Sequence, residues 1–142
     1  MERIRGNYAK IYAFTPYHLA AALGNLNACK MMFDFYGNPG NVNGKTPLHF
    51  AAFYGHLDIC QFLIERIKHK NPKYNLLHET PLHEAASGGH LEICQLIMKY
   101  IKTNPSDIKS NLGTPMQYAT NGGHKKVAEY LSSLSEKMKR CQ

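Results

Sequence analysis

The chain has no tryptophan, few carboxylates and no long apolar run, and these shortages exclude several classes of protein. Ten aspartates and glutamates stand against seventeen lysines and arginines in 142 residues, so the formal net charge is +7. No apolar stretch approaches the roughly 20 residues of a membrane-spanning helix, and Met1 to Arg5 lead into no signal-peptide core. We therefore expect one soluble domain over residues 1–142, located in the cytoplasm, with the nucleus as the alternative.

The sequence also lacks the short motifs that mark common active sites. It contains no GxxxxGK phosphate loop, no GxSxG elbow, no HExxH and no Cys-x-x-Cys. His69 and His78 have no cysteine or carboxylate at the spacing that a zinc site requires. We therefore predict a protein that is not an enzyme and that has no cofactor and no metal site.

What the chain does contain is a sixteen-residue pattern that occurs four times. Residues 80–95 read TPLHEAASGGHLEICQ and residues 46–61 read TPLHFAAFYGHLDICQ, which agree at 12 of 16 positions. More divergent copies begin at Thr15 and at Thr114, so the spacings between the four threonines are 31, 34 and 34 residues. A fixed period of this length indicates stacked supersecondary units.

Each copy has the start, break and second run of a pair of helices. The Thr-Pro step predicts a helix start, because the threonine hydroxyl caps free N–H groups and proline is favoured at the first helical position. The Ala85-Ala86 pair lies in the middle of this helix, where a neighbouring unit must approach closely, and Gly89 ends it. An apolar stripe from Leu91 to Ile97 then predicts a second helix. The expected unit is helix, tight turn, helix, loop.

This pattern closely resembles the ankyrin repeat family, whose signature is a period of roughly 33 residues built on T-P-L-H-x-A-A, G-H and aliphatic residues. The resemblance covers about residues 10 to 135. It implies an all-α ankyrin-repeat solenoid of helix-turn-helix units joined by hairpin-like loops, with repeats at about 10–40, 41–74, 75–108 and 109–137. It also implies protruding hairpins, a concave face lined by the first helices, and a surface that binds other macromolecules.

Most histidines and cysteines fall at constant phases of the repeat. His18, His49 and His83 are the fourth letter of the TPLH motif, and His56, His90 and His124 occupy a second shared position. The resemblance implies that these six form hydrogen bonds that tie one repeat to the next. Cys29, Cys60 and Cys94 also share one position, so they lie about one repeat apart, which is too far for a disulfide. We predict that they are core residues and that Cys141 is exposed.

The two terminal repeats are expected to differ. The first has a second helix rich in Met31, Met32, Phe33 and Phe35, which is more apolar than a solvated cap requires. The leading segment Met1 to Tyr8, a partner, or a further repeat of a longer protein could each cover it. The last repeat has a strongly polar second helix, as a C-terminal cap requires, and we expect fraying after about Ser135.

The basic charge has two interpretations. Several lysines and arginines fall at the C-termini of second helices, where compensation of the helix dipole and solubility explain them. The alternative is a basic surface that binds an acidic protein, nucleic acid or an anionic membrane. Nucleic acid is not favoured, since aromatic stacking platforms are not interleaved with these lysines. The chain could also be the repeat arm of a larger regulatory protein.

The best candidate for function is a non-catalytic adaptor that binds another protein through its concave face and hairpin tips. Phe53 and Tyr54 are the predicted hot spot, because they differ from their counterparts in the third repeat and exposed aromatics are typical interface anchors. The alternative is that these rings only cover gaps between small residues. We expect a monomer whose partner is of unknown identity and acidic under one interpretation of the charge. The predicted protein-binding residues are Phe50, Phe53, Tyr54, Asn43, Lys45, Tyr74, Leu76, Leu77, Glu79, Glu84 and Tyr118.

Overall fold

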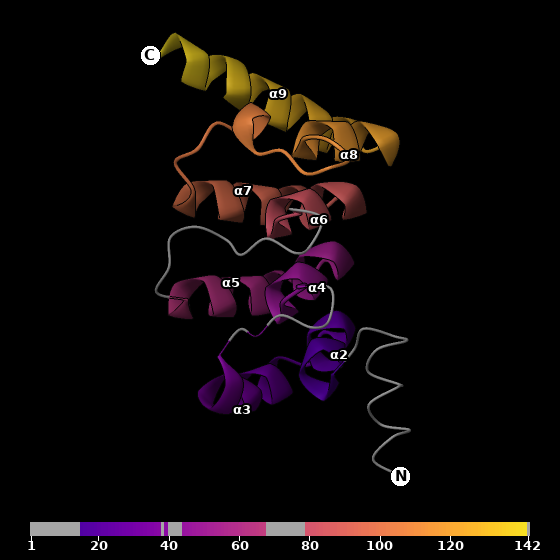
Figure 1. The fold of residues 1–142 in the computed structure, drawn as a ribbon, viewed down its shortest axis with the longest axis vertical. Coiled ribbons are helices and arrows are strands. Elements are labelled where there is room, and N and C mark those ends of the chain that lie inside the picture. Colours follow the sequence, from indigo (N-terminus) through magenta and orange to yellow (C-terminus); the bar gives the residue numbers. More distant parts are fainter. Residues whose placement is uncertain (1–14, 38, 40–43, 68–78, 142) are drawn as a thin grey trace.

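The computed structural model describes residues 15–37, 39, 44–67 and 79–141, which form four stacked pairs of helices (Figure 1). The first helices of the pairs lie in one column and the second helices in another. The first helices are α2 (Pro16–Leu23), α4 (Pro47–Tyr54), α6 (Pro81–Gly88) and α8 (Pro115–Asn121). The second helices are α3 (Leu26–Tyr36), α5 (Leu57–Arg66), α7 (Leu91–Tyr100) and α9 (Lys125–Arg140), and a short 3₁₀ turn, η1 (Pro105–Asp107), precedes α8.

Each first helix begins at the proline of its Thr-Pro step, as the sequence predicts. The Thr46 hydroxyl accepts from the His49 backbone N–H, and the His49 Nδ1 accepts from the Thr46 backbone N–H at 3.0 Å. The same reciprocal cap forms between Thr80 and His83. Two otherwise unpaired N–H groups are satisfied at each of these helix ends, so the TPLH motif acts as a capping box with histidine in place of glutamate.

The other ring nitrogen of each TPLH histidine reaches the next repeat. The Nε2 atoms of His18, His49 and His83 lie 3.0 Å from the backbone oxygens of Pro39, Glu79 and Gly113, respectively. In His49 and His83, Nδ1 accepts a backbone N–H, so Nε2 must carry the proton and donate. The predicted hydrogen-bond tie between repeats is confirmed for these residues.

A second set of histidine contacts runs in the opposite direction along the stack. His56, His90 and His124 place Nε2 at 2.8 to 3.0 Å from the backbone oxygens of Ala22, Phe53 and Ser87 in the preceding repeat. The imidazole of His90 lies so close to Gly55 that a Cβ atom there would be 2.5 Å from its Cε1. Gly55 also has a φ of 85°, so glycine is required both by the backbone conformation and by the neighbouring ring.

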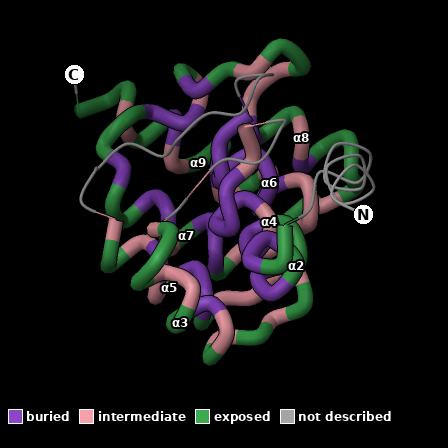
Figure 2. Tube along the Cα trace, turned by 60° about the horizontal axis from the view of Figure 1, so that its bottom comes forward, coloured by how far each residue is buried: buried purple, intermediate pink, exposed green. Residues whose placement is uncertain are grey.

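The core runs through the middle of the stack, where α4 and α6 are largely buried (Figure 2). Leu48, Ile59, Leu63, Leu82 and Ile93 are almost inaccessible and are among its large apolar side chains. The alanine pairs that face neighbouring repeats have no exposed surface at positions 51, 52, 85 and 86. Their small side chains let adjacent helices approach closely.

The cysteines lie where the repeat phase predicts. Cys29, Cys60 and Cys94 are free and buried, and Cys141 is free and exposed. Burial raises the pKa of the Cys29 thiol to about 11 and that of Cys94 to about 12. The interpretation of the three as small core residues is confirmed.

The expectation of fraying after Ser135 is wrong, because α9 continues to Arg140. Ser135 is buried, and its hydroxyl donates to the Asn104 Oδ1 at 2.8 Å. The Asn104 amide nitrogen donates in return to the Ser135 backbone oxygen at 3.3 Å. This contact ties the last helix to the segment before η1, and it involves side chains that the repeat pattern does not identify.

Candidate functional site

The face formed by α2, α4, α6 and α8, which we call the first-helix face, carries the predicted hot spot. Phe53 is 37% exposed and Tyr54 is 50% exposed at the end of α4. Their rings meet edge to face, with centroids 4.9 Å apart and planes at 82°. The two rings hold each other in a defined arrangement and still leave much of their surface accessible.

Two leucines of α2 extend this apolar surface, and the sequence analysis did not select them. Leu19 is 45% exposed and Leu23 is 72% exposed. Leu23 occupies the repeat position of Tyr54, eight residues after the threonine, and Leu19 occupies that of Phe50. Comparing all four repeats at these positions, instead of only the two most similar, would have found them. We call Leu19, Leu23, Phe53 and Tyr54 the apolar patch.

Phe50 packs against the core, unlike the exposed Phe53 and Tyr54 on the same helix. It is partly buried against the core, and its ring meets the His18 imidazole edge to face, with centroids 5.6 Å apart. His18 is the histidine that bridges the first two repeats. Phe50 therefore stabilises the contact between α2 and α4 and presents only part of its surface outward.

Lys45, Glu79 and Glu84 come together where the second and third repeats meet. The Lys45 Nζ lies 3.1 Å from the Glu84 Oε1, and this ion pair joins the turn before α4 to α6. Glu79 and Glu84 are 8% and 5% exposed. Burial is the main cause that raises the pKa of Glu84; the Lys45 charge lowers it, and the Glu79 charge raises it further. The two carboxylates act within the protein more than on its surface.

Tyr118 lies beside this group from the fourth repeat. Its hydroxyl is 2.7 Å from the Ser110 Oγ, and its ring meets the His83 imidazole with centroids 4.8 Å apart. Partial burial, together with the charges of Glu79 and Glu84, raises the pKa of Tyr118 to about 12. We call Lys45, Glu79, Glu84 and Tyr118 the carboxylate cluster.

Four predicted contact residues cannot be placed. Asn43, Tyr74, Leu76 and Leu77 lie outside the described residues. Of the predicted set, the structure therefore brings together Phe53 with Tyr54 in the apolar patch, and Lys45, Glu79, Glu84 and Tyr118 in the carboxylate cluster.

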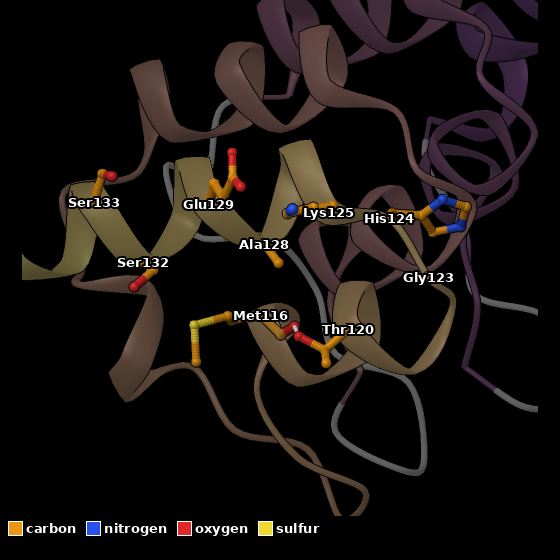
Figure 3. Close-up of a pocket in the computed structure, with 9 residues that line it drawn as sticks. All are labelled: Met116, Thr120, Gly123, His124, Lys125, Ala128, Glu129, Ser132 and Ser133. Atoms are coloured by element: carbon orange, nitrogen blue, oxygen red, sulfur yellow. Dashed lines mark hydrogen bonds between the residues drawn. The ribbon is translucent and has the colours of Figure 1, made fainter.

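A groove of about 520 Å³ opens between α8 and α9 at the C-terminal end of the stack (Figure 3). Its lining includes Met116, Thr120 and Gly123 from the α8 side and Lys125, Ala128 and Ser132 from α9. Thr120 occupies the repeat position of the buried Ala52 and Ala86. The groove is thus the surface that a following repeat covers elsewhere in the stack, and here Thr120, Lys125 and Ser132 add polar groups to its lining.

The described residues carry few features of a metal site or a membrane-spanning segment. In that part of the chain, no group of three or more His, Cys, Asp or Glu side chains could hold a metal ion. No helix in the same residues is long and apolar enough to cross a membrane. The described second helices and the segments that follow them carry ten lysines and arginines and seven aspartates and glutamates, an excess of three positive charges.

Comparison with known proteins agrees with the geometry of the stack. A search of curated proteins finds no match. A family model described as ankyrin repeats (3 copies) matches residues 6–75 and again residues 67–140. These two matches cover nearly the whole chain with the family whose repeats the four helix pairs reproduce. The chain therefore belongs to the ankyrin repeat family.

Proposed function

We propose that this protein is a non-catalytic module that binds a protein partner through its first-helix face, with Phe53 and Tyr54 as the principal contacts. Ankyrin repeats are in general protein–protein interaction modules. The observation that carries the proposal is the exposed aromatic pair at the end of α4, a helix whose other face is fully buried. Solubility alone favours polar residues there, whereas aromatic side chains supply much of the binding energy at interfaces.

The remaining predicted residues have different parts in this proposal. Asn43, Tyr74, Leu76 and Leu77 are proposed contacts in the segments before the first helices. Glu79 and Glu84 are buried, so we assign them to the charge and shape of the surface and not to direct contact. Lys45, Phe50 and Tyr118 are partly accessible, so we assign them a role intermediate between direct contact and support of the surface.

The decisive experiment is the double substitution Phe53→Ala/Tyr54→Ala, tested against proteins recovered by affinity pull-down and identified by mass spectrometry. We expect affinity to fall at least about tenfold, because truncating a hot-spot pair removes about 2 kcal/mol or more. Circular dichroism and the melting temperature should stay close to those of the unmodified protein, since both rings are exposed.

Tyr100→Ala is the matched control. Tyr100 lies on α7, away from the first-helix face, and at 38% it is exposed as much as Phe53. Its removal should leave the affinity unchanged. If Tyr100→Ala weakens binding and the double variant does not, the interface lies on the second helices.

A second candidate, a basic surface that binds an acidic protein, nucleic acid or an anionic membrane, follows from the net charge of +7. The two candidates differ in their response to salt. A polyanion ligand releases counterions, so its log affinity falls linearly and steeply with log salt concentration. An interface centred on Phe53 and Tyr54 should change little between about 50 and 200 mM salt.

A further inference from the structure

The groove between α8 and α9, which we call the C-terminal groove, lies where a following repeat would continue the stack (Figure 3). In each of the three preceding repeats, the next repeat places an imidazole against the turn between the two helices. A Cβ atom on the glycine of that turn would lie within 2.7 Å of the ring, at Gly24, Gly55 and Gly89. The Nε2 of each ring lies 2.8 to 3.0 Å from the backbone oxygen two residues before the glycine. The turn and this oxygen together form a binding site for one histidine side chain.

The last repeat keeps the backbone of this histidine site. Gly123 has a φ of 76°, close to the 78° of Gly89. The His124 N–H donates to the Ala119 backbone oxygen at 2.8 Å, and the equivalent bond occurs in the other three repeats. A Cβ atom on Gly123 would meet no heavy atom of the described chain within 4 Å, its two neighbours in the sequence apart. The site is therefore preformed and open, with the Asn121 backbone oxygen as the equivalent acceptor.

The polar lining of the groove is compatible with a covering partner. The Thr120 hydroxyl donates to a backbone oxygen of its own helix at 2.9 Å, so covering it leaves no unpaired donor. Glu129 and Ser133 occupy repeat positions that are polar and exposed in the other three repeats as well, so they belong to the rim. Lys125 and Ser132 replace residues that are apolar in the other repeats. Docking here should therefore be weaker than the contact between two repeats.

The units that fill this place inside the stack indicate what a partner must present. Each has Gly-His at the start of its second helix, and two apolar residues follow the histidine at fixed distances. The residue three positions after the histidine is aliphatic and buried, as at Ile59, Ile93 and Val127. The residue six positions after it is large, apolar and packed against the core, as at Phe62, Leu96 and Tyr130. The Phe62 ring meets Phe33 of the preceding repeat edge to face, with centroids 5.6 Å apart.

A second copy of this chain does not present these groups. Asn25 occupies the histidine position in the first repeat, and its Oδ1 already accepts from the Ala28 N–H of its own helix. Ala28 itself occupies the position of the buried aliphatic residue. Stacking of two copies head to tail would leave the histidine site empty. The occupant that fits the groove is therefore a different protein.

We propose that the C-terminal groove binds a partner protein through a helix start of the form Gly-His-x-x-aliphatic-x-x-large apolar. The partner's imidazole lies over Gly123 and donates to the Asn121 backbone oxygen. Its large apolar residue lies at Ser132, which occupies the repeat position of Phe33, the residue that Phe62 contacts. This interface is separate from the first-helix face and does not depend on the function proposed for that face.

The test extends the full chain at its C-terminus by a flexible Gly/Ser linker and a second copy of residues 80–101, which carries the motif. The linker must return along α9, whose 16 residues span about 24 Å, and about 20 Gly/Ser residues reach that far. Tethering gives an effective concentration of about 1 mM, so that weak docking is measurable. Docking is followed by the amide NMR shifts of Gly123 and Ala128, relative to the chain that carries the linker alone. Both amides should shift while the extended chain remains monomeric.

Two substitutions test the geometry of the complex. His90→Asn in the appended copy should weaken docking about twofold to tenfold, the range for one hydrogen bond. Ser132→Arg in the groove should abolish the shifts. Gln95→Arg is the matched control, because it also places arginine at an exposed helical position, outside the groove, and should leave docking unchanged.

Three results would overturn the proposal. The first is that the groove amides do not shift in the extended chain. The second is that His90→Asn in the appended copy has no effect on docking, since the site would then not recognise an imidazole. The third is that the unextended chain forms oligomers with the same shifts as its concentration rises, since the occupant would then be a second copy.

Discussion

The outer surfaces of the first and last repeats differ in polarity. In the first repeat, Met31 and Phe35 of α3 are largely exposed, although their counterparts Tyr130 and Leu134 in α9 are partly buried against the preceding repeat. In the last repeat, the surface that a following unit would cover includes polar side chains, as Thr120 shows in place of the buried Ala86. Among the described residues, the second helix of the first repeat therefore exposes large apolar side chains, whereas the last repeat adds polar side chains to its outer surface.

The inter-repeat hydrogen bonds differ between the two ends in the same way. His124 reaches back to the Ser87 backbone oxygen, as His56 and His90 do in their repeats. Asn25 occupies this position in the first repeat, and its side chain caps its own helix by accepting from the Ala28 N–H at 3.1 Å. At the other end, Gln117 replaces the forward-reaching histidine, and among the described residues its Oε1 is hydrogen-bonded to Thr114 alone, accepting from the Thr114 N–H at 2.8 Å. Each terminal repeat retains its local caps and gives up a bond between repeats.

The largest effect on the free energy of unfolding should come from replacing the TPLH leucine of an interior repeat. Its counterpart in the last repeat should have a much smaller effect. Leu82→Ala removes a fully buried side chain, and we expect it to lower the free energy of unfolding by about 2–5 kcal/mol. Met116→Ala changes the equivalent residue, which is 38% exposed, and should cost about 1 kcal/mol or less.

Urea denaturation followed by circular dichroism measures both variants. The denaturation midpoint should shift strongly for Leu82→Ala, with little change in the slope, and weakly for Met116→Ala. Equal shifts would mean that the last repeat packs as tightly as the interior repeats. This result would contradict the difference between the two surfaces.

Much of this architecture could be predicted from the sequence, because the repeat holds local signals at fixed positions. Thr46 and Pro47 set a helix start, and the small Ala51 and Ala52 mark close packing, whatever the rest of the chain does. The ion pair between Lys45 and Glu84 could not be predicted in this way. It depends on how far one repeat is offset from the next, which the period alone does not specify.

The candidate site was less predictable than the fold for the same reason. Glu84 was selected because it occupies the repeat position of Phe50, and Glu79 because it lies in the segment before a first helix. Neither place in the repeat determines exposure. The structure buries both carboxylates, and for Glu84 the ion pair with Lys45 offsets part of the desolvation. Leu23 was missed, although it occupies the repeat position of the exposed Tyr54. Leu19 is exposed at a position where Phe50 is partly buried and Glu84 is buried, so the repeat position alone does not determine its exposure.

Acid should destabilise the interior repeats more than the last one. Burial lowers the pKa of His49 from 6.5 to about 4, and it lowers the pKa of His18 and His83 as well. Because the unfolded chain binds protons more readily at these sites, their contribution to stability is fully present above about pH 6.5 and is lost as the pH falls toward 4. For His49 alone the loss reaches about 3 kcal/mol. Glu84, with its raised pKa, acts in the opposite sense and offsets part of this loss.

His49→Gln is the informative variant, because Gln117 shows that glutamine keeps the capping bond in this chain. The variant should lose some stability at pH 7, since the bond to the Glu79 backbone oxygen is removed, but its stability should depend less on pH between 6.5 and 4. Chemical denaturation at several pH values measures this dependence. An unchanged pH dependence would mean that His49 is not the group responsible.

The C-terminal end and the interior of the stack should differ sharply in thiol reactivity. The substitution that tests this difference should have the smallest effect on stability. The thiolate is the reactive form, and burial raises the pKa of the Cys29, Cys60 and Cys94 thiols, so these three should react slowly in the folded protein. Cys141 is exposed and should react fast.

Titration with a thiol reagent should therefore give one fast and three slow thiols, and four fast ones in denaturant. Cys141→Ser should abolish the fast phase and leave the melting temperature unchanged. Fewer than four thiols in denaturant and non-reducing buffer, or more than one fast thiol in the folded protein, would contradict the buried position of the three core cysteines.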